Sequence, residues 1–445
     1  MTGRDGQMVL GVFFNHTGHH VASWRHPGAD ADAGVNFKHY VRLAQTAEKA
    51  KFHFLFFADW LAVRDASDLT LSRSAQYTAH FEPLTLLGGL AAVTEQIGLV
   101  CTGTTSYNEP FHIARKMASL DHMSGGRAAW NVVTSSFKAE AFNFGREAHY
   151  DHEDRYERAH EFVEVVKGLW DSWDDDAFPR DKESGLYLDP TKLHRLNHEG
   201  KHLRVRGPLN VPRPPQGHPV IVQAGASDTG RELAAATAEV VFTSPHDIPA
   251  GKAFYDDVKG RMAKYGRRPD ELKILPGLSA TVAETDEEAE EKFEYLQSLI
   301  HPEVGREILS LVLEGADLSG YDLDGPLPEI TPEPVGGTPR GVIAMARKEN
   351  LTMRQLYMRL AGARGKRSIK GSVKRVADEM EAWFRAGACD GFILQPAYLP
   401  GSLDEACTLL VPELQKRGLF QTEYRGVTLR DHLGLARPKS RYAKD

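Results

Sequence analysis

The sequence is poor in cysteine and lacks any long hydrophobic run, and both absences exclude classes of protein. Only three cysteines occur in 445 residues, and no two of them have C-x-x-C spacing. A disulfide framework and a thiolate metal site are therefore not expected. The N-terminal apolar run is too short for a signal peptide, and no stretch reaches the roughly 18 apolar residues of a membrane span. We expect a cytoplasmic protein that does not enter membranes.

The chain also lacks an excess of positive charge. Lysine and arginine number 54 against 61 aspartates and glutamates, which gives a net charge of −7. No general field attracts nucleic acid, so we expect no nucleic-acid partner. What is present is the ordinary profile of a globular protein, with 41% hydrophobic and 26% charged residues.

Eight apolar runs of strand length alternate with segments of helical period. The runs cover residues 7–14, 52–59, 97–105, 128–135, 219–227, 240–244, 273–283 and 390–397. This alternation predicts a TIM (β/α)8 barrel, an α/β fold, in one domain over 1–445. Strands and helices also alternate in a doubly wound sheet, but no glycine-rich dinucleotide-binding motif follows the first run, so the barrel is preferred. The long segments at about 136–217 and 301–371 are predicted to be insertions around the site.

Active sites of such barrels lie at the carboxyl ends of the strands, where several polar residues occur. The "AGAS" segment (224–227) precedes a helical segment, so its amides favour a phosphate, or else Ser227 is an ordinary helix N-cap. Asp59 ends the second run, where it is either a hydrogen-bond acceptor in a pocket or an N-cap or turn residue. His152 and Tyr156 share one helical face, which suits either flavin or phosphate contacts or a solvated surface.

The segment "HTGHHVASWRHP" (16–27) contains four histidines directly after the first run. Its H-x-x-H-H pattern has some likeness to a metal site, but it follows a strand, has no H-E-x-x-H glutamate and has no thiolate partners. The alternative is a histidine-rich rim of a pocket, and we expect no metal.

Several long motifs in register resemble the flavin-dependent bacterial luciferase-like monooxygenases. They are "WNVVTS" (130–135), "HEDRY" (152–156), "VIVQAGAS" (220–227), "SLIHPEVG" (298–305) and "DGFILQPAYLPGSLDE" (390–405). More narrowly, the chain resembles the subgroup of nitrilotriacetate, EDTA and dibenzothiophene-sulfone monooxygenases. The likeness covers nearly the whole chain.

The resemblance implies a TIM barrel that binds reduced FMN (FMNH₂) supplied by a separate NAD(P)H:flavin reductase. With O₂ as co-substrate, a flavin C4a-(hydro)peroxide transfers one oxygen atom to a small organosulfur, amine, polyaminocarboxylate, halogenated or aromatic compound. Relatives of this kind form homodimers or homotetramers. The alternatives are an F420-dependent oxidoreductase on the same fold and a flavin-binding protein without turnover.

The resemblance also implies roles for individual residues. The cofactor-binding set is Asp59, Thr104, Asn131, His152, Tyr156, Ala226 and Ser227. An aromatic substrate pocket is expected from Phe14, Phe56 and Trp60, and catalytic contacts from His19, His20 and His301.

Two further segments carry expectations of their own. Arg364, Lys366 and Arg367 either line the pocket, where they favour an anionic substrate, or belong to a solvated loop. The C-terminal segment 421–435 is a candidate interface arm.

Overall fold

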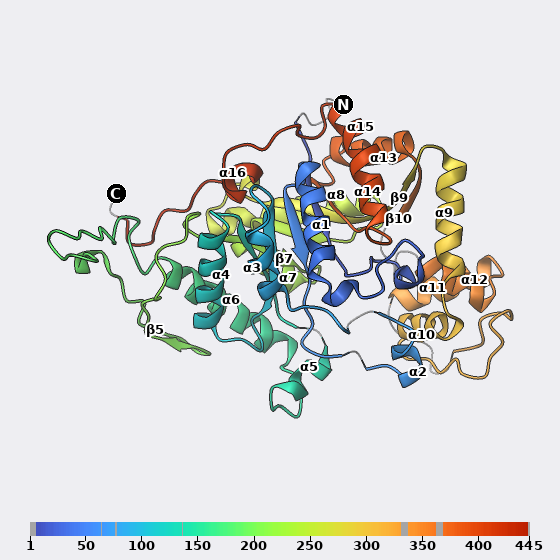
Figure 1. The fold of residues 1–445 in the computed structure, drawn as a ribbon. Coiled ribbons are helices and arrows are strands. Elements are labelled where there is room, and N and C mark those ends of the chain that lie inside the picture. The colour runs from blue at the N-terminus through green and yellow to red at the C-terminus, as the bar shows by residue number, and fades with distance from the viewer. Residues whose placement is uncertain are drawn as a thin grey trace.

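Eight parallel strands close into a barrel at the centre of the molecule (Figure 1). The computed structural model describes residues 6–63, 65–75, 78–135, 137–330, 337–361 and 368–443. The barrel strands are β1 (Val9–Phe13), β2 (Phe54–Phe57), β3 (Gly98–Thr104), β4 (Ala128–Val133), β7 (Val220–Ala224), β8 (Val240–Thr243), β9 (Lys273–Ala283) and β11 (Gly391–Leu394). Pairing of β8 with β9 and of β11 with β1 completes the ring. The predicted TIM barrel is confirmed, and each strand lies within one of the predicted runs.

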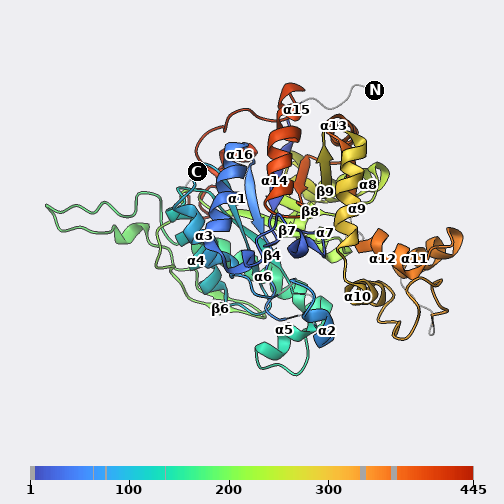
Figure 2. The same cartoon turned by 45° about the vertical axis from the view of Figure 1, so that its right-hand side comes forward.

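Helices surround the barrel (Figure 2). Their apolar side chains pack on the outward-facing side chains of the strands. The helices are α1 (Phe37–Lys49), α3 (Pro83–Ala91), α4 (Pro110–Met123), α6 (His152–Trp170), α7 (Asp228–Thr237), α8 (Ile248–Arg261), α9 (Asp286–Ser298), α13 (Val373–Arg385), α14 (Gly401–Glu405) and α15 (Val411–Lys416). Side-chain N-caps fix several starts: Asn36 begins α1, Asp247 begins α8 and Thr285 begins α9.

Alternation along the strands divides their side chains between two cores. Phe13, Phe54 and Phe56 point into the barrel, whereas Phe14 and Phe57 point outward into the helical layer. This period of two is what a strand buried on both faces produces.

The C-terminal segment closes the amino-terminal end of the barrel. Helix α16 (Leu429–Leu433) packs Leu429 and Leu433 into the barrel interior. A Cβ on Gly98 would lie 2.5 Å from Leu429 Cδ1, so this glycine makes room for the leucine. The leucines of segment 421–435, the candidate interface arm, are thus buried in the chain's own core.

The two insertions extend outward from the barrel (Figure 1), except for α6, which packs on α4, and β10 (Ser368–Ser372), which pairs with β9. The first contains α5 (Lys138–Asn143), α6 and the small antiparallel pair β5 (His198–Glu199) and β6 (Arg204–Val205), with an arm that extends from the barrel (Figure 1). The second contains α10 (Pro302–Val312), α11 (Gly337–Lys348), α12 (Met353–Ala361) and β10. The helices of the second insertion share an apolar cluster of their own. Short α2 (Asp68–Leu71) lies beside α10. Arg364, Lys366 and Arg367 lie outside the described residues.

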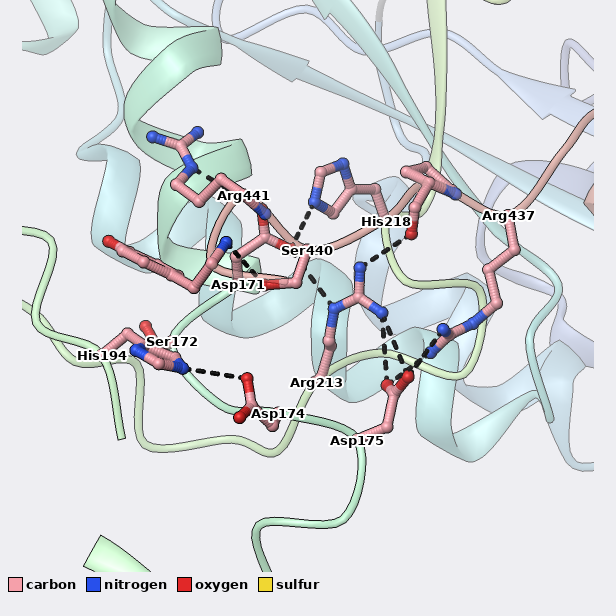
Figure 3. A network of polar contacts seen from close by, with 12 residues as sticks. Asp171, Ser172, Asp174, Asp175, His194, Arg213, His218, Arg437, Ser440 and Arg441 are labelled. Carbon is pink, nitrogen blue, oxygen red and sulfur yellow. Dashed lines mark hydrogen bonds and ion pairs between the residues drawn. The ribbon is translucent and has the colours of Figure 1, made fainter. Parts of the chain in front are cut away.

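A buried polar network fastens the C-terminal tail to the first insertion (Figure 3). Asp171 Oδ1 lies 2.9 Å from His218 Nε2 and 3.3 Å from Arg213 Nε. Arg213 also donates to the carbonyl of Pro438 at 2.8 Å, while Arg437 pairs with Asp175. The tail is therefore part of the folded structure. In the described ranges, no helix is both long and apolar enough to cross a membrane.

Candidate active site at the carboxyl end of the barrel

A chamber of about 480 Å³ opens at the carboxyl ends of the strands. This is the size of a small-molecule site, in the place where TIM barrels carry their active sites. Nine predicted residues line it together: Phe56, Asp59, Trp60, Thr104, Asn131, His152, Tyr156, Ala226 and Ser227. They come from five different elements or the loops that follow them, so the barrel closure brings them together.

One end of the chamber is polar and lies at the start of α7. Ser227 is the N-cap of this helix, and its Oγ accepts a hydrogen bond from Gly230 N at 3.1 Å. The same Oγ lies 3.4 Å from Tyr156 Oη, and the Tyr156 and His152 rings are 4.8 Å apart. The capping role and the chamber-facing position of Ser227 therefore coexist. Hydroxyl groups beside a helix N-terminus suit an anion such as a phosphate.

Glycine keeps this polar end open. A Cβ on Gly230 would lie 3.0 Å from Ser227 Oγ and 3.2 Å from Tyr156 Oη. Both distances are tighter than an ordinary carbon contact. A side chain at residue 230 would therefore crowd both hydroxyls.

The central part of the chamber is held by hydrogen bonds between β3 and β4. Asn131 Nδ2 donates to Thr102 Oγ1 at 2.9 Å, and that hydroxyl donates to the carbonyl of Phe57 at 2.7 Å. Thr104 Oγ1 accepts from Ser106 N and from Ser135 Oγ. These bonds fix the Asn131 amide with its Oδ1 left for another partner.

Unpartnered polar atoms gather on this chamber. In the part of the chain that the structure describes, ten buried side-chain nitrogen or oxygen atoms have no hydrogen-bond partner. Four of them belong to chamber-lining residues, namely Asn131 Oδ1, Glu140 Oε2, Arg155 Nε and Gln223 Oε1. Each such atom costs about 1–3 kcal/mol when it stays unpaired. These atoms are available to hydrogen-bond a polar ligand or water in the chamber.

Aromatic side chains form another part of the lining, the aromatic wall. The Phe13 and Phe56 rings meet edge to face at 4.9 Å, and Phe56 stacks on Phe242 at 6.0 Å. Trp60 completes the lining. Phe14, predicted to belong to this pocket, instead packs on Phe57 on the outer side of the strands, because neighbouring residues of a strand face opposite ways.

Asp59 lies half-buried in the lining, with Oδ1 accepting from Trp60 N at 3.0 Å. The pKa of this carboxyl is raised to about 6, chiefly by burial and to a smaller extent by the charges of Glu82 and Glu140, against opposing effects of His80 and the Trp60 amide. Asp59 therefore exchanges its proton close to neutral pH.

The three predicted catalytic histidines lie outside the chamber lining. His20 is buried, with Nε2 at 2.9 Å from Gln297 Oε1 and Nδ1 accepting from Ala22 N. His301 is the N-cap of α10, where its Nδ1 accepts from Glu303 N. His19 is closer, because its ring packs edge-on against Phe13 at 4.5 Å and its Nε2 lies 3.0 Å from the Phe13 carbonyl.

The histidine-rich segment does not converge on one point. His16 contacts the carbonyl of Ala75, and His26 stacks on Tyr398 at 3.8 Å. Among the residues that the structure describes, no three histidine, cysteine or acidic side chains are arranged to hold a metal ion. Each histidine has its own local surroundings.

Fifteen chamber residues lie outside the predicted site set, and Phe13, Glu140, Arg155, Gln223 and Phe242 are among them. Phe13 and Phe56 share the inward parity that their pairing sets, so strand register is the signal that identifies Phe13. Arg155 adjoins the predicted His152 and Tyr156 in "HEDRY". Glu140 lies in the first insertion, whose path over the barrel has no local sequence signature.

The barrel and its chamber define a TIM-barrel protein with a candidate small-molecule site at the strand ends, lined by polar and aromatic side chains. The profile of the family described as luciferase-like monooxygenase matches residues 17–388. The chain belongs to this family, as its motifs predicted.

Named relatives agree with this assignment. The chain is 53% identical to nitrilotriacetate monooxygenase component A of Aminobacter aminovorans, over 99% of both chains. It is 49% identical to N-acetyl-S-(2-succino)cysteine monooxygenase of Bacillus subtilis (strain 168), over the full length of both. A crystal structure of a riboflavin lyase with modified FMN and riboflavin is 32% identical, with a TM-score of 0.83 over 96% of both chains. The protein is therefore a flavin-dependent monooxygenase.

Proposed function

We propose that this protein is the oxygenase component of a two-component system, using FMNH₂ from an NAD(P)H:flavin reductase and O₂ to oxygenate a small organic compound. The chamber carries this proposal, because its lining combines the polar residues at the start of α7, several unpartnered polar atoms and the aromatic wall. The relative named component A supports a second component, and the lyase with modified FMN supports the cofactor.

The residues present fit FMN. Ser227, the Ala226 segment, Tyr156 and His152 would hold the phosphate at the start of α7, with Asp59, Thr104 and Asn131 on the side of the isoalloxazine ring. When bound, reduced FMN supplies the electrons that activate O₂, so that one oxygen atom enters the substrate and the other leaves as water.

The chain's own contribution is to orient the reactants and exclude water. Phe13, Phe56 and Phe242 form a wall without polar side-chain groups, which limits water beside the reacting atoms. Asp59 holds or releases a proton near neutral pH. His19, which adjoins the Phe13 wall, is the predicted catalytic histidine best placed for a substrate contact.

For the substrate, we propose a small amine or thioether that carries several carboxylates. Nitrilotriacetate and N-acetyl-S-(2-succino)cysteine, for which two relatives are named, both have carboxylates around a central nitrogen or sulfur atom. Arg155 and His152 in the chamber lining offer donors to such groups.

The test supplies the purified protein with NADH, FMN and a flavin reductase under ¹⁸O₂, over a panel of polycarboxylate amines and thioethers. We expect one compound to acquire ¹⁸O and to suppress release of H₂O₂. If no compound suppresses H₂O₂ release, or if F420 binds far more tightly than FMN, the proposal is wrong.

A further inference from the structure

Glu140 has a chamber position that the proposed binding set does not use. It lies in α5 of the first insertion, and only 3% of the residue is exposed. Its Oε1 accepts a hydrogen bond from Leu61 N at 3.4 Å. Its Oε2 is buried and has no partner within the described ranges, and the residue lines the chamber.

The orientation of Glu140 is fixed by the loop that follows β2. Asn143, one turn further along α5, donates from Nδ2 to the Leu61 carbonyl at 2.7 Å. Helix α5 thus binds both polar backbone groups of Leu61, in the loop that also carries Asp59 and Trp60. With Oε1 directed at this loop, Oε2 is the oxygen left for a ligand.

A carboxylate oxygen is an acceptor only, and a buried one without a donor is unfavourable. The charge of Glu140 contributes to the raised pKa of Asp59, so a second carboxylate lies near this part of the lining. Among the charged or titratable groups that line the chamber, the nitrogen-bearing side chains are His152 and Arg155, and Glu140 Oε2 has no hydrogen bond to either. A molecule that enters the chamber with an N–H or O–H group would supply the donor.

We propose that Glu140 is a ligand-binding residue whose Oε2 accepts a hydrogen bond from an N–H or O–H group of the molecule in the chamber. This inference rests on the proposed function, and the donor belongs either to the flavin ring or to the substrate. The glutamate selects for a donor at that position and against an acceptor or an anion.

The decisive variant is Glu140→Gln. The amide oxygen can still accept from Leu61 N, so the loop contact is kept, while an NH₂ donor replaces the unpartnered Oε2. Asn143→Ala is the matched control, because it removes the other bond to Leu61 and leaves Oε2 unchanged. Thermal melting of both variants establishes that they are folded.

Two measured constants distinguish a flavin donor from a substrate donor. One is the Kd for FMN and FMNH₂, from fluorescence and anaerobic titration, and the other is the KM for substrate. If the flavin donates the hydrogen bond, we expect Glu140→Gln to raise the Kd for flavin at least tenfold. If the substrate donates it, the variant should raise only the KM, again at least tenfold. Asn143→Ala should change both by less than threefold.

The inference is overturned if Glu140→Gln leaves both values within threefold of wild type. It is also overturned if Asn143→Ala reproduces the loss, because the effect would then come from the loop. A wild-type protein that binds neither form of FMN refutes the proposed function together with this inference, whereas an FMN-binding wild type with an unaffected Glu140→Gln variant refutes the inference alone.

Discussion

Tyr156→Phe tests the phosphate end of the chamber with the least disturbance. The substitution removes only the hydroxyl, which lies 3.4 Å from Ser227 Oγ, and keeps the ring beside His152 at 4.8 Å. Ser227→Ala is less informative on its own. That change also removes the N-cap of α7, which costs about 0.5–2 kcal/mol of stability.

The size of the effect follows from the charge of the partner. A hydrogen bond to a charged group contributes about 1.5–3 kcal/mol, and every 1.4 kcal/mol is a tenfold change in Kd. If Tyr156 Oη donates to the FMN phosphate, Tyr156→Phe should raise the Kd for FMN by about 10-fold to 150-fold.

Riboflavin provides the control ligand, because it has the same ring and ribityl chain without a phosphate. Fluorescence titrations should show a large loss of FMN affinity in Tyr156→Phe and little change for riboflavin. Tyr187→Phe, at a residue that is 63% exposed on the extended arm, should bind both ligands like wild type. Equal losses for FMN and riboflavin, or no loss for either, would refute the assignment of the phosphate to this end.

Two further substitutions test electrostatics away from the phosphate. The folded-state pKa of Asp59 is about 6, above the ordinary 3.8, so the ionised carboxylate lowers stability above pH 6 and this penalty disappears below about pH 4. Urea denaturation of Asp59→Asn should therefore show a higher free energy of unfolding than wild type at pH 8 and little change at pH 4. A gain of the same size at both pH values would contradict this explanation. Arg213→Met removes one buried partner of Asp171, which keeps His218, and the bond to the Pro438 carbonyl (Figure 3). The loss of a hydrogen bond to a charged group should cost about 1.5–3 kcal/mol and speed proteolysis of the C-terminal tail. An unchanged cleavage rate would show that other contacts hold the tail.

The barrel can be predicted from the sequence because its signals, the apolar runs and the helical periodicity between them, are local. Each of the eight apolar runs contains one barrel strand, and the segments between them have helical period. The chamber residues at strand ends follow from the same reasoning, since Asp59, Thr104 and Asn131 lie at or near the ends of their strands. Closure of the barrel then determines that they meet.

Side-chain direction and long-range contacts are what local patterns leave undetermined. "VFF" contains both Phe13 and Phe14, and only the pairing with β2 decides which one faces inward. His20 follows a strand as an active-site residue would, yet it contacts Gln297, which is 277 residues away in the chain. Leu429 reaches the barrel base from a segment without a strong pattern, and Glu140 reaches the chamber from an insertion.

Acceptors outnumber donors among the unpartnered atoms of the chamber, and this excess predicts which redox form of the flavin binds more tightly. Within the described residues, three are acceptors, Asn131 Oδ1, Glu140 Oε2 and Gln223 Oε1, against the single donor Arg155 Nε. Reduced isoalloxazine has an N–H at N5 where the oxidised ring has an acceptor. An acceptor-rich chamber therefore favours the reduced form. We expect a lower Kd for FMNH₂ than for FMN. The bound flavin should then have a higher midpoint potential than free FMN. A potential equal to or below that of free FMN would show that these acceptors do not face the ring.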